Sequence, residues 1–253
     1  MSADLHAVMM TMYNTTAEQL VLTKMTVESV LRQDIGPLHL WMVNNGGNQE
    51  TREWLDNLRL PEPHQLTREH YPANVAPTKV FNHLAYSFFA LGHDKVLAVP
   101  NDTILPPNLY SELVKWSRGV VAAWANNGTL DFTPTEKSHA TGEDPYISVA
   151  LTRKWCFDAL VAKDGYFLDE RYFMYCCDCD LKLRLHACGI RGIQLDIQYG
   201  HYGSGCWRLA PPEISRSITD RADEDRARFV EKWGFPIGSP EHVAADQDIN
   251  FVG

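Results

Sequence analysis

The chain has 253 residues, of which 45% are hydrophobic and 22% are charged, and its formal net charge is −9. This is the composition of a globular protein that can bury a sizeable core, and its 7 Trp, 10 Tyr and 10 Phe exclude disorder as the main state. The acidic balance argues against a general nucleic-acid binder, which needs a basic face. It leaves room for a small anionic ligand held by a metal ion or a helix N-terminus.

We expect no targeting or membrane segment. The longest apolar run, residues 85–91, falls far short of the roughly 20 residues of a membrane span. The first six residues include Asp4 and no basic cluster, unlike a secretory signal. Cys176, Cys177 and Cys179 crowd together, which is a poor disulfide framework, so we expect a reducing, cytoplasmic compartment.

The first half of the chain alternates strand and helix patterns. The predicted strands are 5–12, 38–43, 65–70 and 95–99, and the predicted helices are 16–33, 50–58 and 77–91 (or 75–91). Thr15 or Thr16 is expected to cap the first helix, and Gly92 to end the third. This order predicts an α/β fold with a mostly parallel sheet covered by helices.

The second half is less regular. Predicted strands are 120–125, 146–151 and 193–197, and predicted helices are 107–117, 152–162, 178–188 and part of 213–233. Residues 126–145 are rich in turn formers and read as a long loop. Because no repeat or linker marks a boundary, we expect one domain over 1–253, with portions 1–103, 104–210 and a helical extension 211–253.

Three predicted strand ends are polar, and parallel sheets bind ligands at such ends. They are Tyr13-Asn14-Thr15, Asn44-Asn45-Gly46-Gly47 and Pro100-Asn101-Asp102-Thr103. Turn formation explains any one of them, but together they suit a base, a ribose and a metal-bound diphosphate. Asp102 directly follows a strand, where one carboxylate plus phosphate oxygens can hold Mg²⁺ or Mn²⁺; its alternative role is a helix cap.

Asp178 and Asp180 begin a predicted helix after an aromatic stretch. Both suit the helix dipole, but apolar walls also raise the pKa of a carboxylate and make it a better base near neutrality. Arg184 lies four residues after Asp180 and can pair with it, which leaves Asp178 as the freer acid. His201 follows a strand in a glycine-rich loop and gains interest only if it folds back onto Asp102.

A zinc site is the alternative from another class. Cys176 and Cys179 form a Cys-x-x-Cys pair, which is one half of a usual zinc motif, and His186 and Cys188 follow closely. A second pair on a separate turn is missing, so small packing residues are the favoured interpretation of these cysteines.

The order of these motifs resembles the family 2 glycosyltransferases of the GT-A fold, especially the rhamnosyltransferase-like branch. The resemblance runs from about Leu5 to Ser204. Its most specific stretch is Phe167-Leu168-Asp169-Glu170 with Phe173, Tyr175, Asp178, Asp180-Leu181, Arg184 and Gly189. It also covers Met12-Tyr13-Asn14, Gln33, Val43 to Gly47, Asn74, Asn82, Pro100 to Thr103, His201 and Ser204.

The resemblance implies an inverting, metal-dependent transfer from a nucleoside-diphosphate sugar to an acceptor hydroxyl. Residues 1–103 would bind the nucleotide sugar and 104–210 would carry the acceptor and catalytic half. The donor would contact Tyr13, Asn14, Asn44, Asn45, Asn74, Asn101 and Asp102, and Mn²⁺ or Mg²⁺ would bind Asp102 and His201. Asp178 would be the general base, and Asp180 and Arg184 would position that base or the acceptor. Asp169 and Glu170 would bind the acceptor or order the loop, and residues 126–145 would form a lid over donor and acceptor.

Three departures from the family pattern bear on this interpretation. Asn44 replaces the usual Asp, Pro100 replaces the first acid of the metal motif, and Cys177 replaces the Glu before Asp178. A catalytically silent nucleotide- or sugar-binding homologue is therefore the second alternative. The sequence names neither sugar, nucleotide nor oligomeric state, and the acceptor is a glycan, a protein, a nucleic acid or a small molecule; the net charge disfavours DNA.

Overall fold

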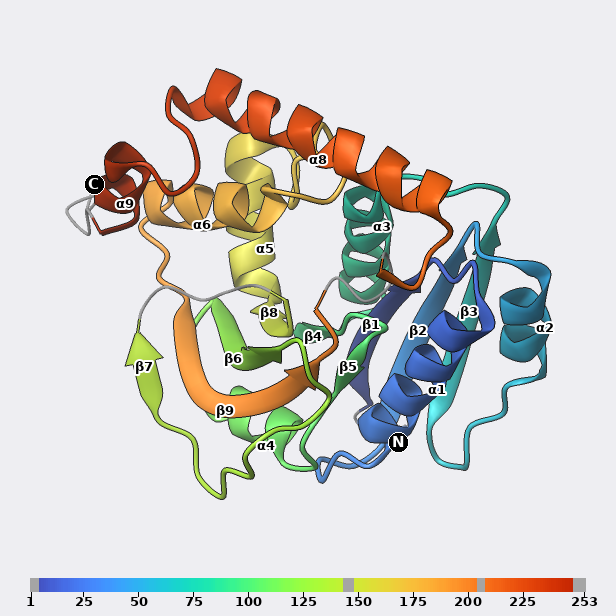
Figure 1. The fold of residues 1–253 in the computed structure, drawn as a ribbon. Helices are drawn as coiled ribbons and strands as arrows, with labels where there is room; N and C mark the ends of the chain where they lie inside the picture. The colour runs from blue at the N-terminus through green and yellow to red at the C-terminus, as the bar shows by residue number, and fades with distance from the viewer. Residues whose placement is uncertain (1–4, 143–147, 204–207, 248–253) are drawn as a thin grey trace.

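The computed structural model describes residues 5–142, 148–203 and 208–247. Within them, nine strands form one sheet in the order β3-β2-β1-β4-β8-β6-β9-β5, and β7 pairs with β9 (Figure 1). The strands are β1 His6–Met12, β2 Leu38–Asn45, β3 Gln65–Tyr71, β4 Lys95–Ala98, β5 Thr103–Ile104, β6 Val120–Asn127, β7 Ala140–Gly142, β8 Ala150–Arg153 and β9 Ile193–His201. The helices are α1 Ala17–Leu31, α2 Gln49–Asn57, α3 Pro77–Ala90, α4 Leu109–Val114, α5 Lys154–Asp164, α6 Cys177–Ala187, α8 Pro212–Trp233 and α9 Pro240–Gln247.

The predicted α/β fold with a helix-flanked central sheet is confirmed. Strands β3, β2, β1 and β4 are mutually parallel, as is the pair β6 and β9. Strand β8 is antiparallel to both of its neighbours, β4 and β6, and β5 is antiparallel to β9. The parallel half therefore brings the carboxyl ends of β1, β2 and β4 to one edge of the sheet.

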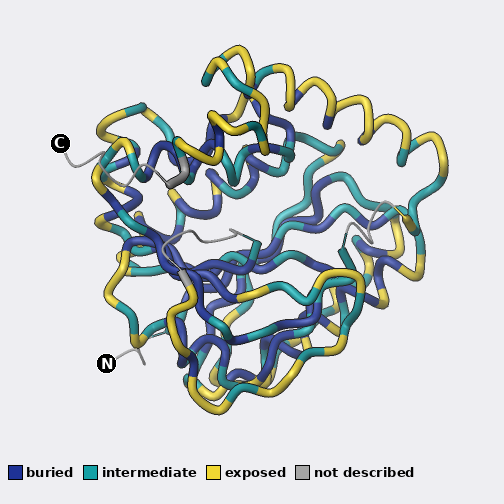
Figure 2. Tube along the Cα trace, turned by 60° about the vertical axis from the view of Figure 1, so that its left-hand side comes forward, coloured by how far each residue is buried: buried dark blue, intermediate teal, exposed yellow. Residues whose placement is uncertain are grey.

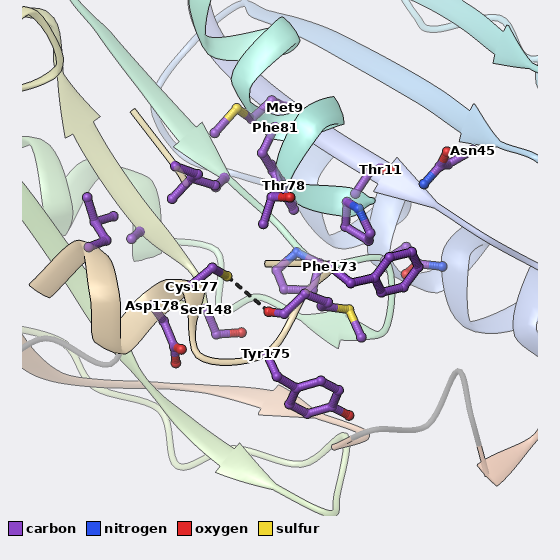
Figure 3. A pocket seen from close by; sticks show the side chains of 18 of the residues that line it. Met9, Thr11, Asn45, Thr78, Phe81, Ser148, Phe173, Tyr175, Cys177 and Asp178 are labelled. Carbon is purple, nitrogen blue, oxygen red and sulfur yellow. Dashed lines mark hydrogen bonds between the residues drawn. The ribbon is translucent and has the colours of Figure 1, made fainter. Parts of the chain in front are cut away.

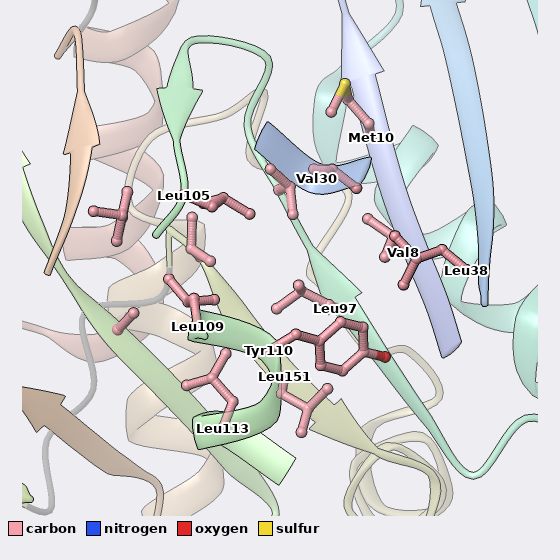
Figure 4. Close-up of a cluster of buried hydrophobic side chains, with 14 of the residues drawn as sticks. Val8, Met10, Val30, Leu38, Leu97, Leu105, Leu109, Tyr110, Leu113 and Leu151 are labelled. Atoms are coloured by element: carbon pink, nitrogen blue, oxygen red, sulfur yellow. The ribbon is translucent and has the colours of Figure 1, made fainter. Parts of the chain in front are cut away.

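Helices cover both faces of the sheet. One core packs α1, α2 and α4 against the strands, with Val30, Leu109 and Leu113 fully buried (Figure 4). The other packs α3, α5 and α6 on the opposite face. Figure 2 shows the central strands buried and the outer side of α8 exposed.

The first helix begins as its sequence predicts. Thr16 is the N-cap, with its side chain accepting from the Gln19 backbone N–H, and the Gln19 side chain reaches back to complete a capping box. Gln33, just past the helix, accepts from the Tyr110 N–H and donates to the Pro106 carbonyl, so it ties α1 to the start of α4. Gly92 follows α3 with φ +92°, as expected of a helix stop.

Several elements differ from the predictions. Part of the predicted loop 126–145 is the strand β7, and β8 begins at Ala150 rather than at Tyr146, which lies outside the described residues. Strand β5 and helix α9 were not predicted, because two and eight residues give little periodic signal. Strand β9 continues through Gly200, where a Cβ would come within 2.1 Å of the Leu130 carbonyl oxygen, so a larger residue would break this close approach.

The long helix α8, the first of the two helices in the C-terminal extension, lies across the outside of α3 and α6 (Figure 1). Phe229 of α8 is fully buried in a small core with Tyr172, Cys176 and Leu183. The extension is thus packed against the segment that leads into α6. No helix in the described part of the chain has both the length and the apolarity to cross a membrane.

Candidate active site

A cavity of about 350 Å³ opens at the carboxyl ends of β1, β2 and β4. Its other walls come from the start of α3, the segment 173–178 that leads into α6, and the end of β9 (Figure 3). The structure brings many of the predicted site residues to this cavity: Tyr13, Asn45, Asn74, Asn101, Asp102, Asp178 and His201. Residues far apart in the sequence therefore share one hollow.

His201 does fold back onto Asp102. Strand β5 pairs with β9 so that Thr103 lies opposite His201, and the Tyr202 N–H donates to the Asp102 carbonyl at 3.0 Å. The His201 Nε2 atom lies 3.4 Å from Asp102 Oδ1. On the other side of the ring, Nδ1 lies 2.7 Å from the Asn127 amide oxygen.

This pair has the chemistry of a divalent-cation site. The Asn127 oxygen only accepts, so Nδ1 donates to it, and in the neutral ring this tautomer has its lone pair on Nε2. Nε2 and the Asp102 carboxylate then face each other as two ligands, and both are nearly buried. Among the described residues no three His, Cys, Asp or Glu side chains form a metal-binding group, so oxygens of a substrate and water would complete the shell.

Asp178 also lines the cavity, lies in the first turn of α6 and is half-buried (Figure 3). The N-cap Cys176 has φ 64°, a left-handed conformation that is uncommon for a residue with a side chain and that turns the chain sharply into the helix. Burial raises the pKa of the Asp178 carboxyl, against backbone hydrogen bonding and the nearby His242. A carboxylate with a raised pKa beside a cavity is suited to accept a proton.

Among the described residues, Cys177 belongs to no cluster of metal-binding side chains and to no disulfide. Its thiol donates to the Met174 carbonyl at 3.0 Å, and burial raises its pKa far above that of a free thiol (Figure 3). None of the cysteines that the structure describes forms a disulfide. The zinc alternative finds no support, because Cys176, Cys179, His186 and Cys188 do not come together as a metal-binding group.

Two predicted donor residues lie outside the cavity wall. The Asn14 side chain is fully buried and bonds to Thr23 and Asn101 at 2.9–3.0 Å. The Asn44 amide oxygen accepts from the Gly47 N–H at 2.8 Å and thereby shapes the turn after β2. Both amides build the loops that carry the cavity residues.

Three of the other predicted catalytic and acceptor residues, Asp180, Arg184 and Asp169, belong to an ion-pair network with Lys232. Arg184 binds Asp164 at 2.6 Å and lies 3.7 Å from Asp180, so its expected pairing with Asp180 is the weaker contact. Asp180 instead contacts Lys232 at 2.6 Å and accepts from the Trp233 indole. Lys232 also binds Asp169 at 2.9 Å.

Glu170 is exposed and accepts a hydrogen bond from Asn82 of α3. Asn82 also donates to the Leu168 carbonyl and accepts from the Leu168 N–H, both at 2.8 Å. The helix Asn that the resemblance singled out therefore fixes the segment before α6.

Asp225 of α8 is a residue that the sequence analysis missed. Its fully buried carboxylate accepts three consecutive backbone N–H bonds, from Phe173 at 2.8 Å and from Met174 and Tyr175 at 2.9 Å each. These three residues line the cavity. A signal existed in the spacing: Asp225 shares the period of Ile218, Ala222 and Phe229, which marks the buried face of an amphipathic helix.

Solved structures of glycosyltransferases share this fold. The S. aureus TarS fragment 1–349 aligns over 95% of this chain and 77% of its own, with 13% identity and a TM-score of 0.57. The same fragment in complex with UDP-GlcNAc covers 98% and 80%, with 15% identity and a TM-score of 0.53. The mannosyltransferase PcManGT from Pyrobaculum calidifontis, in complex with GDP-Man and Mn²⁺, covers 97% and 68%, with 13% identity and a TM-score of 0.59.

No family model and no curated protein matches the chain. At these identities the likeness shows the fold: this chain has the architecture of the GT-A glycosyltransferases to which it is similar.

Proposed function

We propose that this protein is an inverting glycosyltransferase that moves a sugar from a nucleoside-diphosphate sugar to an acceptor hydroxyl. The carrying observation is that one cavity at the strand ends has the Asp102–His201 pair on one wall and Asp178 on another. The glycosyltransferases of the same fold, crystallised with UDP, UDP-GlcNAc or GDP-Man, support a nucleotide sugar as the donor. We also propose that the protein belongs to the rhamnosyltransferase-like branch of these enzymes.

The donor would lie along the polar edge of the cavity. Tyr13 offers a half-exposed ring for the base, and Asn45, Asn74 and Asn101 line the edge between it and Asp102. Mn²⁺ or Mg²⁺, held by Asp102 and His201, would neutralise charge on the leaving diphosphate. Nothing beyond these two ligands is required from the chain, because phosphate oxygens and water complete such a shell.

Asp178 would act as the general base of a single displacement. As the acceptor oxygen bonds to the anomeric carbon, the bond from that carbon to the diphosphate oxygen breaks, and the acceptor proton passes to Asp178. The raised pKa of Asp178 brings it closer to neutrality, where a base both stays ionised and binds a proton effectively. Asp180, Arg184 and Asp169 would support this base through the network with Lys232.

Replacement of the base separates an enzyme from a silent homologue. In Asp178→Asn we expect transfer and donor hydrolysis to fall by about 10²–10⁴-fold, while nucleotide affinity is retained. Asp158→Asn, on the exposed side of α5, is the matched control and should keep full activity. NMR of the product would show inversion of the anomeric configuration.

A wild-type protein that binds a nucleotide sugar but neither transfers nor hydrolyses it would support the silent homologue instead. Retention of configuration would contradict the single displacement.

A further inference from the structure

The cavity has an apolar end behind its polar edge. There it is lined by Met9 of β1, Ala98 of β4, Ala150 of β8, Phe81 of α3, Leu181 of α6 and Phe167, which lies between α5 and α6. Met9 and Phe81 lie on the side of the cavity away from Asp178 and Ser148 (Figure 3). None of these six side chains is a conventional hydrogen-bonding group, although the hydroxyl-bearing residues Thr11 of β1 and Thr152 of β8 also line the cavity.

Two small side chains leave this space open. Ala98 and Ala150 are register partners on the adjacent strands β4 and β8, so they stand side by side on the sheet face that looks toward α3 and α6. Their neighbours along the strands, Val96 and Thr152, are buried, whereas Ala98 stays partly exposed although β4 is a central strand. Protein interiors are normally filled to crystal density, so two opposed alanines at the centre of a sheet mark a hollow that a ligand can fill.

The chemistry of this hollow selects its occupant. A phosphate or a ribose placed there would exchange its several hydrogen bonds to water for little more than the hydroxyl of Thr152, the residue two positions after Ala150. An aryl or alkyl group would instead gain the burial of its apolar surface.

We propose that the apolar end binds the apolar part, an aryl or alkyl group, of the acceptor. This inference rests on the proposed function, which puts the diphosphate at the Asp102–His201 wall. Leu181 lies three residues after Asp178, on the same face of α6, so the apolar end adjoins the base. A molecule whose hydroxyl meets Asp178 can therefore extend its apolar part into the hollow, while the donor occupies the polar edge.

The test compares phenyl β-D-glucoside with methyl β-D-glucoside, which differ only in the apolar group. Binding of each is measured by calorimetry to the full chain, with UDP or GDP and Mn²⁺ present. We expect the phenyl compound to bind at least about tenfold more tightly, as burial of a ring predicts.

Filling the hollow supplies the second arm. Ala150→Leu and the smaller Ala98→Val should remove the phenyl preference and leave nucleotide binding unchanged. Ala90→Leu, on the exposed end of α3, is the control and should keep the preference. Two sizes of substitution keep the test informative if the larger one prevents folding.

Three outcomes would overturn the proposal. Equal binding of the two glucosides to the wild type would show that the hollow takes no apolar group of an acceptor. A variant that gains thermal stability and keeps the phenyl preference would mark the hollow as a packing void. Weaker binding of UDP-GlcNAc, with UDP affinity and the phenyl preference retained, would assign it to an acyl group of the donor.

Failure of the proposed function has a different signature. It appears as an absence of Mn²⁺-dependent nucleotide binding by the wild type, or as binding of a nucleotide sugar without transfer or hydrolysis, whatever the two glucosides do.

Discussion

The proposed general base, Asp178, makes the pH dependence of the reaction predictable. Burial raises the pKa of its carboxyl in the folded protein, so its ionised form is disfavoured relative to an ordinary aspartate. A base must be ionised, so kcat/KM should fall as the pH falls through this raised pKa. We expect the acid limb of the kcat/KM profile to lie clearly above the ~3.9 of a free aspartate.

The profile is measured with saturating metal over a range in which the fold is intact. The same limb should be missing from the residual activity of Asp178→Asn. An unchanged limb in that variant would assign the titration to another group.

Lys232 holds two carboxylates behind the site. It bridges Asp169 and Asp180, both almost completely buried. Lys232→Met leaves two buried acids without this partner, and we expect a loss of about 3–5 kcal/mol in the free energy of unfolding, measured by urea denaturation at pH 7. Lys79→Met, at an exposed position of α3, is the control and should change the free energy little.

The pH dependence of that loss follows from Asp169. Burial opposes its ionisation, but hydrogen bonds from Arg171 and Lys232 outweigh the burial and hold the pKa of Asp169 well below its usual range. A depressed pKa stabilises the fold above the unfolded value of ~3.9 and loses this effect as the pH falls below it. The difference between wild type and Lys232→Met should therefore shrink on acidification, and a constant difference would contradict this role.

Among the elements, helix α8 supports the cavity wall from outside. Asp225 receives the three N–H groups of residues 173–175 on its two oxygens, so an amide at this position would oppose an N–H with its own donor. We expect Asp225→Asn to cost about 1–3 kcal/mol in the free energy of unfolding and to lower kcat. Asp223→Asn, on the exposed side of the same helix, is the matched control.

The comparison is informative because a purely structural role would change stability alone. If Asp225→Asn lost stability but kept kcat and KM under conditions where it is folded, α8 would not position the wall.

Patterns among neighbouring residues predicted most helices and strands, but elements that depend on long-range pairing were not predicted. Residues close together in the sequence determine three of these features: the capping box of α1, the glycine after α3 and the helical period of α6. Strand β5 has two residues and exists because β9 passes beside it, which no local pattern encodes.

The same limit applies to the candidate site. Amides at strand ends look alike in sequence whether they line the cavity, as Asn45 and Asn101 do, or shape a turn, as Asn44 does. Asp225 was not recognised because its neighbours in the sequence are also charged, although its spacing from Ala222 and Phe229 places it on the buried face of α8. His201 could be named from its motif, but its approach to Asp102 needed the pairing of β5 with β9.

At the scale of the whole molecule, the fold assembles one cavity from distant parts of the chain. The ends of the parallel strands form the polar edge of the cavity. Strand β9 brings His201 next to Asp102, and α6 carries Asp178. The central claim is that this cavity binds a nucleoside diphosphate through a metal ion at Asp102 and His201.

The most direct test is thermal stability against UDP, GDP, dTDP, CDP and ADP, each with and without Mn²⁺, for the wild type and for Asp102→Asn. A nucleotide at ~100 times its Kd should add ~2.7 kcal/mol, a rise in Tm of ~5–10 °C for a chain of this size. We predict such a rise for one nucleotide with Mn²⁺, lost in Asp102→Asn and kept in the exposed control Asp131→Asn. No rise with any nucleotide, or a rise that Asp102→Asn retains in full, would contradict the account.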